Sequence, residues 1–143
     1  MWRFNNLNSC WGVQGRKKYP DELSGGMRQR IALLRTYLFA KDITLLDEPF
    51  SALDAITKDE MHSWYMNMRK KYDISTIFIT HDVDEAILLS DRIYILGNRP
   101  ASIINEIKIE IGKRDNSFKL SENFLEYKRQ VLKSLDQYDQ EKS

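Results

Sequence analysis

The chain has a single cysteine, Cys10, among its 143 residues, which excludes an internal disulfide and a cysteine-built metal site. Such sparing use of cysteine fits a reducing compartment. Long apolar runs are lacking too, since Ile31 to Leu34 is among the longest and about 20 residues are needed to cross a bilayer. The first residues, Met1 to Asn6, show no continuous apolar stretch of the kind found in a secretory signal. We therefore expect any membrane association to come through a partner.

An excess of charge of one sign is also lacking, because 22 basic and 21 acidic residues leave a net charge of +1. No field exists to attract nucleic acid or acidic lipid. The cluster Arg69-Lys70-Lys71 falls at a predicted helix end, where cations favour the helix dipole. A solvated helix end is therefore favoured over a nucleic-acid patch, since no wider basic stripe surrounds it. With 42% hydrophobic and 30% charged residues, the composition is ordinary for one globular domain.

Hydrophobic spacing predicts helices that alternate with strands, as in a parallel α/β sheet. We expect a helix from Ser24 to about residue 38, a strand over 43–46, a helix over about 57–71, a strand over 75–80, a helix over 83–89 and a strand over 92–96. Thr57 and Glu60 have the spacing of a capping box for the second helix. A half-exposed strand within 101–111 and a final helix capped by Ser121 follow, and residues 137–143 are predicted to be frayed. Residues 1–20 have weak periodicity, and no structure is assigned to them.

Two adjacent carboxylates, Asp47 and Glu48, directly follow the apolar strand. Parallel α/β sheets place their ligands at the carboxyl ends of strands. One carboxylate there can hold a hydrated Mg²⁺ on nucleotide phosphates while its neighbour polarises an attacking water. We assign Asp47 to the metal and Glu48 to the water. The alternative is an exposed strand end with two solvated acids.

Two further features suggest contact with phosphate. Ser24-Gly25-Gly26 places a hydroxyl cap and two residues without Cβ at a helix start, so backbone N–H groups there can approach a γ-phosphate. The alternative for an isolated Ser-Gly-Gly is a plain turn. His81 follows the strand over 75–80, and its imidazole can reach a phosphate oxygen. A lone histidine more often has a structural role, which is our interpretation of His62 inside the second helix.

Four motifs stand in a fixed order along the chain. They are Leu23 to Arg30 (LSGGMRQR), Ile43 to Pro49 (ITLLDEP), Ser51 to Asp54 (SALD) and Thr80-His81-Asp82. Over residues 17–135 this series resembles the second half of the ATPase subunit of ABC transporters. The resemblance implies an α/β fold, namely the parallel-sheet half of a P-loop NTPase with its signature helix. Lys18-Tyr19-Pro20, Pro49 to Asp54 and Lys113-Arg114-Asp115 resemble the nitrate, sulfonate and taurine importer group. Leu34, Thr36 and the first sixteen residues depart from the family pattern.

The resemblance also implies roles for these residues. In the family, two ATPase subunits pack head to tail and each ATP lies between them. Ser24, Gly25, Gly26 and Met27, which stands where many relatives have Gln, would touch ATP held by the partner subunit. Ser51 to Asp54 would link the two sites, while Asp47 as metal ligand and the catalytic Glu48 and His81 would serve the nucleotide of their own subunit. The implied cofactors are ATP and Mg²⁺. The implied partners are a second ATPase subunit and transmembrane permease subunits, at the cytoplasmic face of a bacterial membrane.

No Gly-x-x-x-x-Gly-Lys-Ser/Thr loop stands anywhere in the chain, although the resembled subunits hold the phosphates with one. We therefore expect a truncated ATPase domain in four parts: 1–20 without assigned structure, 21–42 around the signature helix, 43–96 as the α/β core, and 97–143 as a C-terminal strand and helix. By itself such a chain should not hydrolyse ATP, because positioning and electrostatics supply nearly all the catalysis of phosphoryl transfer. In complete relatives a further strand lies between 75–80 and 92–96. Exposed strand edges and poor solubility are therefore also expected.

Three functions remain open. The leading one is part of the ATP-binding and ATP-hydrolysing subunit of an importer for nitrate, sulfonate or taurine-type solutes. The second is a non-catalytic half-site that docks on a complete ATPase subunit, or else an inert remnant of a degraded gene. The third, a non-transport ABC ATPase in nucleic-acid repair or translation, is disfavoured because the sequence shows neither basic arms nor coiled-coil insertions.

Overall fold

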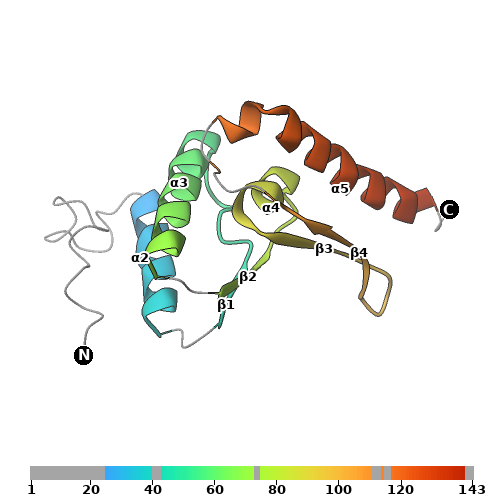
Figure 1. The fold of residues 1–143 in the computed structure, drawn as a ribbon. Coiled ribbons are helices and arrows are strands. Elements are labelled where there is room, and N and C mark those ends of the chain that lie inside the picture. Colours follow the sequence, from blue (N-terminus) through green and yellow to red (C-terminus); the bar gives the residue numbers. More distant parts are fainter. Residues whose placement is uncertain (1–24, 40–42, 73–74, 111–113, 115–116, 141–143) are drawn as a thin grey trace, which may run out of the picture. The chain divides into compact units, whose positions relative to one another are not determined.

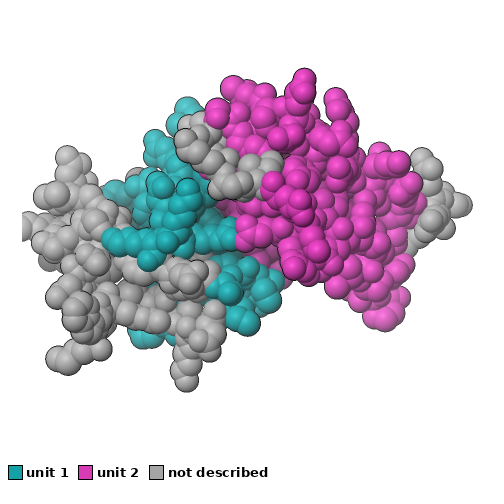
Figure 2. Space-filling view, in the orientation of Figure 1, with its two compact units in different colours: residues 1–77 teal, residues 78–143 magenta. Residues whose placement is uncertain are grey.

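The computed structural model describes residues 25–39, 43–72, 75–110, 114 and 117–140. In chain order the elements are α2 (Gly25–Phe39), β1 (Ile43–Asp47), α3 (Ala55–Tyr72), β2 (Ser75–Ile79), α4 (Val83–Leu89), β3 (Arg92–Gly97), β4 (Ser102–Lys108), the 3₁₀ turn η3 (Phe118–Leu120) and α5 (Glu122–Gln140) (Figure 1). The chain divides into two compact units, residues 1–77 and 78–143, shown in teal and magenta in Figure 2.

In the first unit, α2 packs against α3. Strand β1 forms a two-stranded parallel sheet with β2, which begins in the first unit and ends just beyond its last residue, Ile77. The 18-residue helix α3 is the crossover between these strands, the connection that parallel neighbours need. Along β1, buried residues alternate with exposed ones. Thr44 and Leu46 are buried while Ile43 and Leu45 are 62% and 61% exposed, so one face of this sheet is apolar and open in the part of the chain that the structure describes.

The buried hydrophobic residues of the first unit come from both helices, from β1 and from the turn after it. They are Leu33, Leu34, Leu46, Phe50, Met61, Tyr65 and Met68. Phe50 lies at the centre with no exposed surface, and its ring meets the edges of His62 and Tyr65 at centroid distances of 5.0 and 6.1 Å. The Met61, Tyr65 and Met68 side chains, spaced four and three residues apart along α3, therefore belong to the core. His62 is buried in the same cluster, which agrees with a structural role.

The second unit is built around an antiparallel hairpin with α5 packed along it. In the hairpin β3 and β4 run from the pair Arg92 and Lys108 to the pair Gly97 and Ser102, with an irregularity between Ile95 and Leu96. The buried apolar side chains of this unit are Ile87, Leu88, Leu89, Ile93, Ile95, Ile107, Ile109, Phe118, Phe124 and Val131. The Phe118 and Phe124 rings pack edge to face, 5.3 Å apart, and join η3 to α5.

The expected strand over 92–96 is confirmed as β3. Within the described residues there are two separate two-stranded sheets, β1 with β2 and β3 with β4. Strand β4 follows β3 through the turn after Gly97, where Asn98 has a φ of 68°. Asn tolerates this left-handed conformation, and the turn sends β4 back along β3.

Two expected helix boundaries also need correction. Helix α3 begins at Ala55, and Asp54 accepts the backbone N–H of Thr57 at 3.1 Å, so Asp54 caps the helix in place of the predicted capping box of Thr57 and Glu60. Helix α5 continues to Gln140, beyond the expected start of fraying at Gln137. The cap of α5 is confirmed, because the Ser121 hydroxyl accepts the N–H of Phe124 at 3.2 Å.

Candidate functional site

The two signature glycines have different surroundings. A Cβ on Gly25 would meet nothing within 4 Å, whereas one on Gly26 would lie 2.9 Å from the Cγ2 methyl of Thr57. The first turn of α2 carries no acidic side chain to offset the positive end of the helix. Gly25 is thus open to a ligand, while Gly26 is a glycine because α3 approaches α2 closely. Ser24, predicted to act with them, lies outside the described residues.

Asp54, predicted from the resemblance to link two nucleotide sites, is bound to the start of α3. Its carboxylate accepts the Thr57 hydroxyl at 2.7 Å and the Thr57 N–H at 3.1 Å. These bonds, the hydroxyl bond first, lower the pKa of Asp54, because hydrogen bonds to a carboxylate favour its charged form. Thr57 also lies close to Gly26. This one residue therefore connects the Ser51 to Asp54 loop with the signature turn at Gly25 and Gly26.

The acidic pair lies at the carboxyl end of β1. Asp47 is the exposed last residue of the strand, and Glu48 follows with a φ of 41°. A non-glycine residue in this left-handed region costs about 1 to 3 kcal/mol and persists only where its surroundings fix it. Here the Glu48 carbonyl accepts the N–H of Ser51 at 3.3 Å and the Ser51 hydroxyl at 3.0 Å. The predicted catalytic carboxylate therefore sits on a strained turn.

Gln29 was not singled out by the sequence analysis, although it lies inside the LSGGMRQR match. Its side-chain amide donates to the carbonyl of Pro49, the residue after Glu48. The next residue, Arg30, reaches α3 through Glu60 Oε2 at 3.6 Å and Met61 Sδ at 3.4 Å. Gln29 is part of the LSGGMRQR motif, but nothing in the sequence indicated its contact with Pro49, twenty residues further along the chain.

His81 lies in the second unit, between the end of β2 and the start of α4, and is exposed. The residues on both sides of it are held. The Thr80 hydroxyl donates to Glu85 at 2.9 Å and accepts the Asp82 N–H at 3.0 Å, and Asp82 caps α4 by accepting the N–H groups of Asp84 and Glu85. Glu85 is only 2% exposed, so the loop that presents His81 rests on a buried carboxylate.

The structure thus joins three predicted features within the first unit: the signature turn at Gly25 and Gly26, the acidic pair, and Asp54. Met27, at the start of the same helix, is half-buried. His81 belongs to the second unit, so its expected action on the same nucleotide as Asp47 and Glu48 stays a prediction.

The residues present fit contacts to the terminal phosphate of a nucleotide and its Mg²⁺, rather than a whole nucleotide site. Among the described residues, no three His, Cys, Asp or Glu side chains gather into a metal cluster. Magnesium on a nucleotide needs less, because one or two carboxylates with water and phosphate oxygens complete its shell. The exposed Asp47 carboxylate at a strand end fits that demand.

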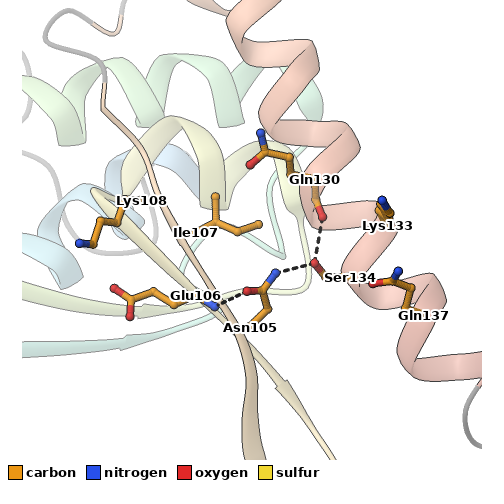
Figure 3. Close-up of a pocket in the computed structure, with 8 residues that line it drawn as sticks. All are labelled: Asn105, Glu106, Ile107, Lys108, Gln130, Lys133, Ser134 and Gln137. Carbon is orange, nitrogen blue, oxygen red and sulfur yellow. Dashed lines mark hydrogen bonds between the residues drawn. The ribbon is translucent and has the colours of Figure 1, made fainter.

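A separate groove of about 410 Å³ lies between β4 and α5 (Figure 3). It is lined by Asn105, Glu106, Ile107, Lys108, Gln130, Lys133, Ser134 and Gln137. The side-chain amide of Asn105 donates to the Ser134 hydroxyl across it at 2.8 Å. None of the predicted site residues lines this groove. No helix in the described ranges has the length and apolar content needed to span a membrane.

Comparison with known proteins agrees with these features. The family model "ABC transporter" matches residues 5–51. This match begins at residue 5, within the first sixteen residues, which were expected to depart from the family pattern. The chain carries part of an ABC ATPase domain, with the α/β fold that the motifs imply.

Several similar proteins are named as ATP-binding proteins of import systems. The chain is 48% identical over 91 residues to the formylaminopyrimidine import ATP-binding protein of Halalkalibacterium halodurans, covering 64% of this chain and 36% of that protein. It is 41% identical over 122 residues to the aliphatic sulfonates import ATP-binding protein of Bacillus cereus, covering 84% and 47%. It is 44% identical over 93 residues to the nitrate import ATP-binding protein of Synechocystis, covering 65% and 35%. The chain thus spans between about a third and a half of the length of these relatives.

Proposed function

We propose that the chain supplies the signature helix and the hydrolytic side chains of an ATPase subunit that drives solute import. Glu48 orients the attacking water, and Asp47 is the side chain that would hold the hydrated Mg²⁺ of the nucleotide. His81 contacts a γ-phosphate oxygen. Bound Mg²⁺ would neutralise the charge that develops on the phosphoryl group. The backbone N–H groups at Gly25 and Gly26 serve the nucleotide of a second subunit.

One observation carries this proposal: Glu48, directly after a strand end that carries Asp47, is held at a φ of 41° by hydrogen bonds to its carbonyl. Backbone strain of this kind concentrates at active sites, where the surrounding structure fixes a reactive group. Two solvated acids at a plain strand end would have no need of it. The alternative that we kept open for Asp47 and Glu48 is therefore disfavoured.

The solute and the partners are proposed from the relatives. Their printed names include aliphatic sulfonates and nitrate, so we propose a small anionic solute of the nitrate, sulfonate or taurine type. We further propose a second ATPase subunit and transmembrane permease subunits as partners, at the cytoplasmic face of a bacterial membrane. Transport of radiolabelled nitrate and alkanesulfonates in cells lacking the gene would test this assignment, and unchanged uptake of both would contradict it.

The hydrolytic roles can be tested by supplying what the sequence lacks. The phosphate loop would come from the N-terminal part of the Bacillus cereus sulfonates protein, joined to this chain at the start of their 122-residue match. We expect the chimera to hydrolyse ATP in a Mg²⁺-dependent manner, and the chain alone to show no turnover. Glu48→Gln in the chimera should lower kcat by about 100-fold or more, because water activation of this kind contributes 10² to 10⁴ in rate.

Glu110→Gln is the matched control, because it makes the same chemical change at an exposed residue just beyond β4. It should leave kcat within about twofold of the unaltered chimera. The proposal is wrong if Glu48→Gln and Glu110→Gln have the same kcat. It is also wrong if the chain alone hydrolyses ATP and keeps that activity in Glu48→Gln.

The half-site function is a second candidate, favoured by the open surroundings of Gly25. A chain that only offers its signature turn would copurify with a complete ATPase subunit in the presence of ATP. Gly25→Asp should weaken this association, because it places a negative charge beside the phosphates. Gly25→Ala has room for its methyl group and should not. Equal binding by the two variants would exclude this function.

A further inference from the structure

We infer that Gln29 is a positioning residue for Glu48, so that the signature helix fixes the turn that carries the hydrolytic carboxylate. That Glu48 is catalytic rests on the proposed function, whereas the role of Gln29 in holding the Glu48 turn does not. The Gln29 contact would connect the signature turn, proposed to meet the nucleotide of a second subunit, to the Glu48 turn, proposed to act on the nucleotide of this subunit.

The turn needs support because its geometry is unfavourable for its residues. Glu48 has a φ of 41°, a conformation that L residues rarely adopt. A residue that precedes proline is normally extended, and Pro49 follows Glu48 directly. Both features oppose the observed backbone, so other contacts must hold it.

Those contacts come from two sides. On the C-terminal side, the N–H and hydroxyl of Ser51 donate to the Glu48 carbonyl at 3.3 and 3.0 Å. These bonds are local to the turn. The Gln29 amide instead donates to the Pro49 carbonyl from α2, one helical turn after Gly25. Of these three bonds it alone is made by another element, so it relates the turn to the signature helix.

A second contact keeps the two segments in register. The Thr57 methyl would lie 2.9 Å from a Cβ on Gly26, and Thr57 is itself bound to Asp54. The first two turns of α2 therefore touch the segment after β1 at its beginning, through Pro49, and at its end, through Thr57. A displacement of the helix start would move Glu48 with it.

The test uses the full chain and amide hydrogen exchange, without nucleotide. Gln29→Met keeps the length of the side chain and removes its donor, and Arg28→Met makes a similar change at the exposed neighbouring position of the same helix. In Gln29→Met we expect the Ser51 N–H to exchange about fivefold to tenfold faster, the size set by one lost hydrogen bond. The Thr57 N–H, bound to Asp54, should keep its rate. Arg28→Met should change neither rate, and Gln29→Lys, which restores a donor, should return Ser51 toward its original protection.

A double-mutant cycle with Glu48→Gly provides a readout specific to the turn. In the unaltered chain, Glu48→Gly should raise the folding equilibrium constant several-fold, because glycine relieves the strain at a positive φ. In Gln29→Met the turn is free to relax, so the gain should shrink to less than about twofold. The inference is overturned if the Ser51 and Thr57 rates rise together, if neither rises, or if the gain from Glu48→Gly is the same in both backgrounds. Since no arm contains ATP, failure here is separate from failure of the chimera to hydrolyse ATP.

Discussion

Adjacent glycines of the signature turn should respond in opposite directions to the same substitution. Gly25→Ala adds a methyl group to open space, and alanine favours a helix over glycine by about 0.5 to 1 kcal/mol in a helix interior. Because Gly25 is the first residue of α2, we expect the low end of that range, a stabilisation of about 0.5 kcal/mol.

Gly26→Ala gains the same helical preference but creates a clash. Its methyl group would lie 2.9 Å from Thr57 Cγ2, closer than two carbons approach without displacement. Thr57 is not free to turn away, because its hydroxyl and its N–H are both bound to Asp54. Overpacking of this kind costs about 1 to 3 kcal/mol, so the net effect is a destabilisation of about 0.5 to 2.5 kcal/mol after the helical gain of about 0.5 kcal/mol is subtracted.

The assay is urea denaturation followed by circular dichroism on Gly25→Ala, Gly26→Ala and the double variant of Gly26→Ala with Thr57→Ser. Serine keeps the hydroxyl that binds Asp54 and lacks the methyl group that clashes. Thr57→Ser should therefore recover most of the loss caused by Gly26→Ala, while changing the stability of the unaltered chain little. Equal effects of the two glycine substitutions, or no recovery with serine, would refute the packing argument for Gly26.

Three further predictions concern other parts of the fold. The Arg114 side chain is 9% exposed and binds Asp91 at 3.0 Å and the carbonyls of Ser90 and Ile109. Arg114→Ala should therefore lower the free energy of unfolding by about 2 to 3 kcal/mol. A loss below about 0.5 kcal/mol in urea denaturation would contradict this prediction. The pKa of Asp54 is lowered by its bonds to Thr57, so the charged Asp54 should stabilise the fold fully above the ordinary carboxyl pKa of about 3.9, and this stabilisation should decline as the pH falls toward the folded pKa. The urea midpoint of Asp54→Asn should therefore approach that of the unaltered chain as the pH falls through this range. A difference between the two midpoints that stays constant with pH would contradict this prediction. Leu45 is 61% exposed on the open sheet face, so Leu45→Lys should reduce self-association in analytical ultracentrifugation, and an unchanged sedimentation profile would show that this face is not responsible.

Much of the secondary structure could be predicted from local spacing alone. The strands at Ser75 and Arg92, the helix Val83–Leu89 and the Ser121 cap are confirmed, because period and capping chemistry act over a few residues. The motifs likewise predicted the α/β class and the ABC ATPase domain, since their order along the chain is a property of the sequence.

Two features were not predicted from the spacing of residues, namely the pairing of β4 and the cap of α3. The alternation of strands and helices indicated a parallel sheet, but it did not show that β4 pairs antiparallel with β3, because strand pairing is decided by neighbours across the fold. The cap of α3 was assigned to Thr57 because its spacing to Glu60 is favourable. Asp54 outcompetes it, since a carboxylate placed three residues before Thr57 accepts both its N–H and its hydroxyl.

The sequence by itself determined which chemistry is present: an acidic pair after an apolar strand, glycines at a helix start and a histidine after a second strand. Only the tertiary structure decided how these groups are supported, namely the approach of Thr57 to Gly26, the bond from Gln29 to Pro49 and the positive φ of Glu48. The physical reason is range. Residue type and short spacing fix what a group can do, whereas contacts between segments twenty or more residues apart fix where its backbone is held.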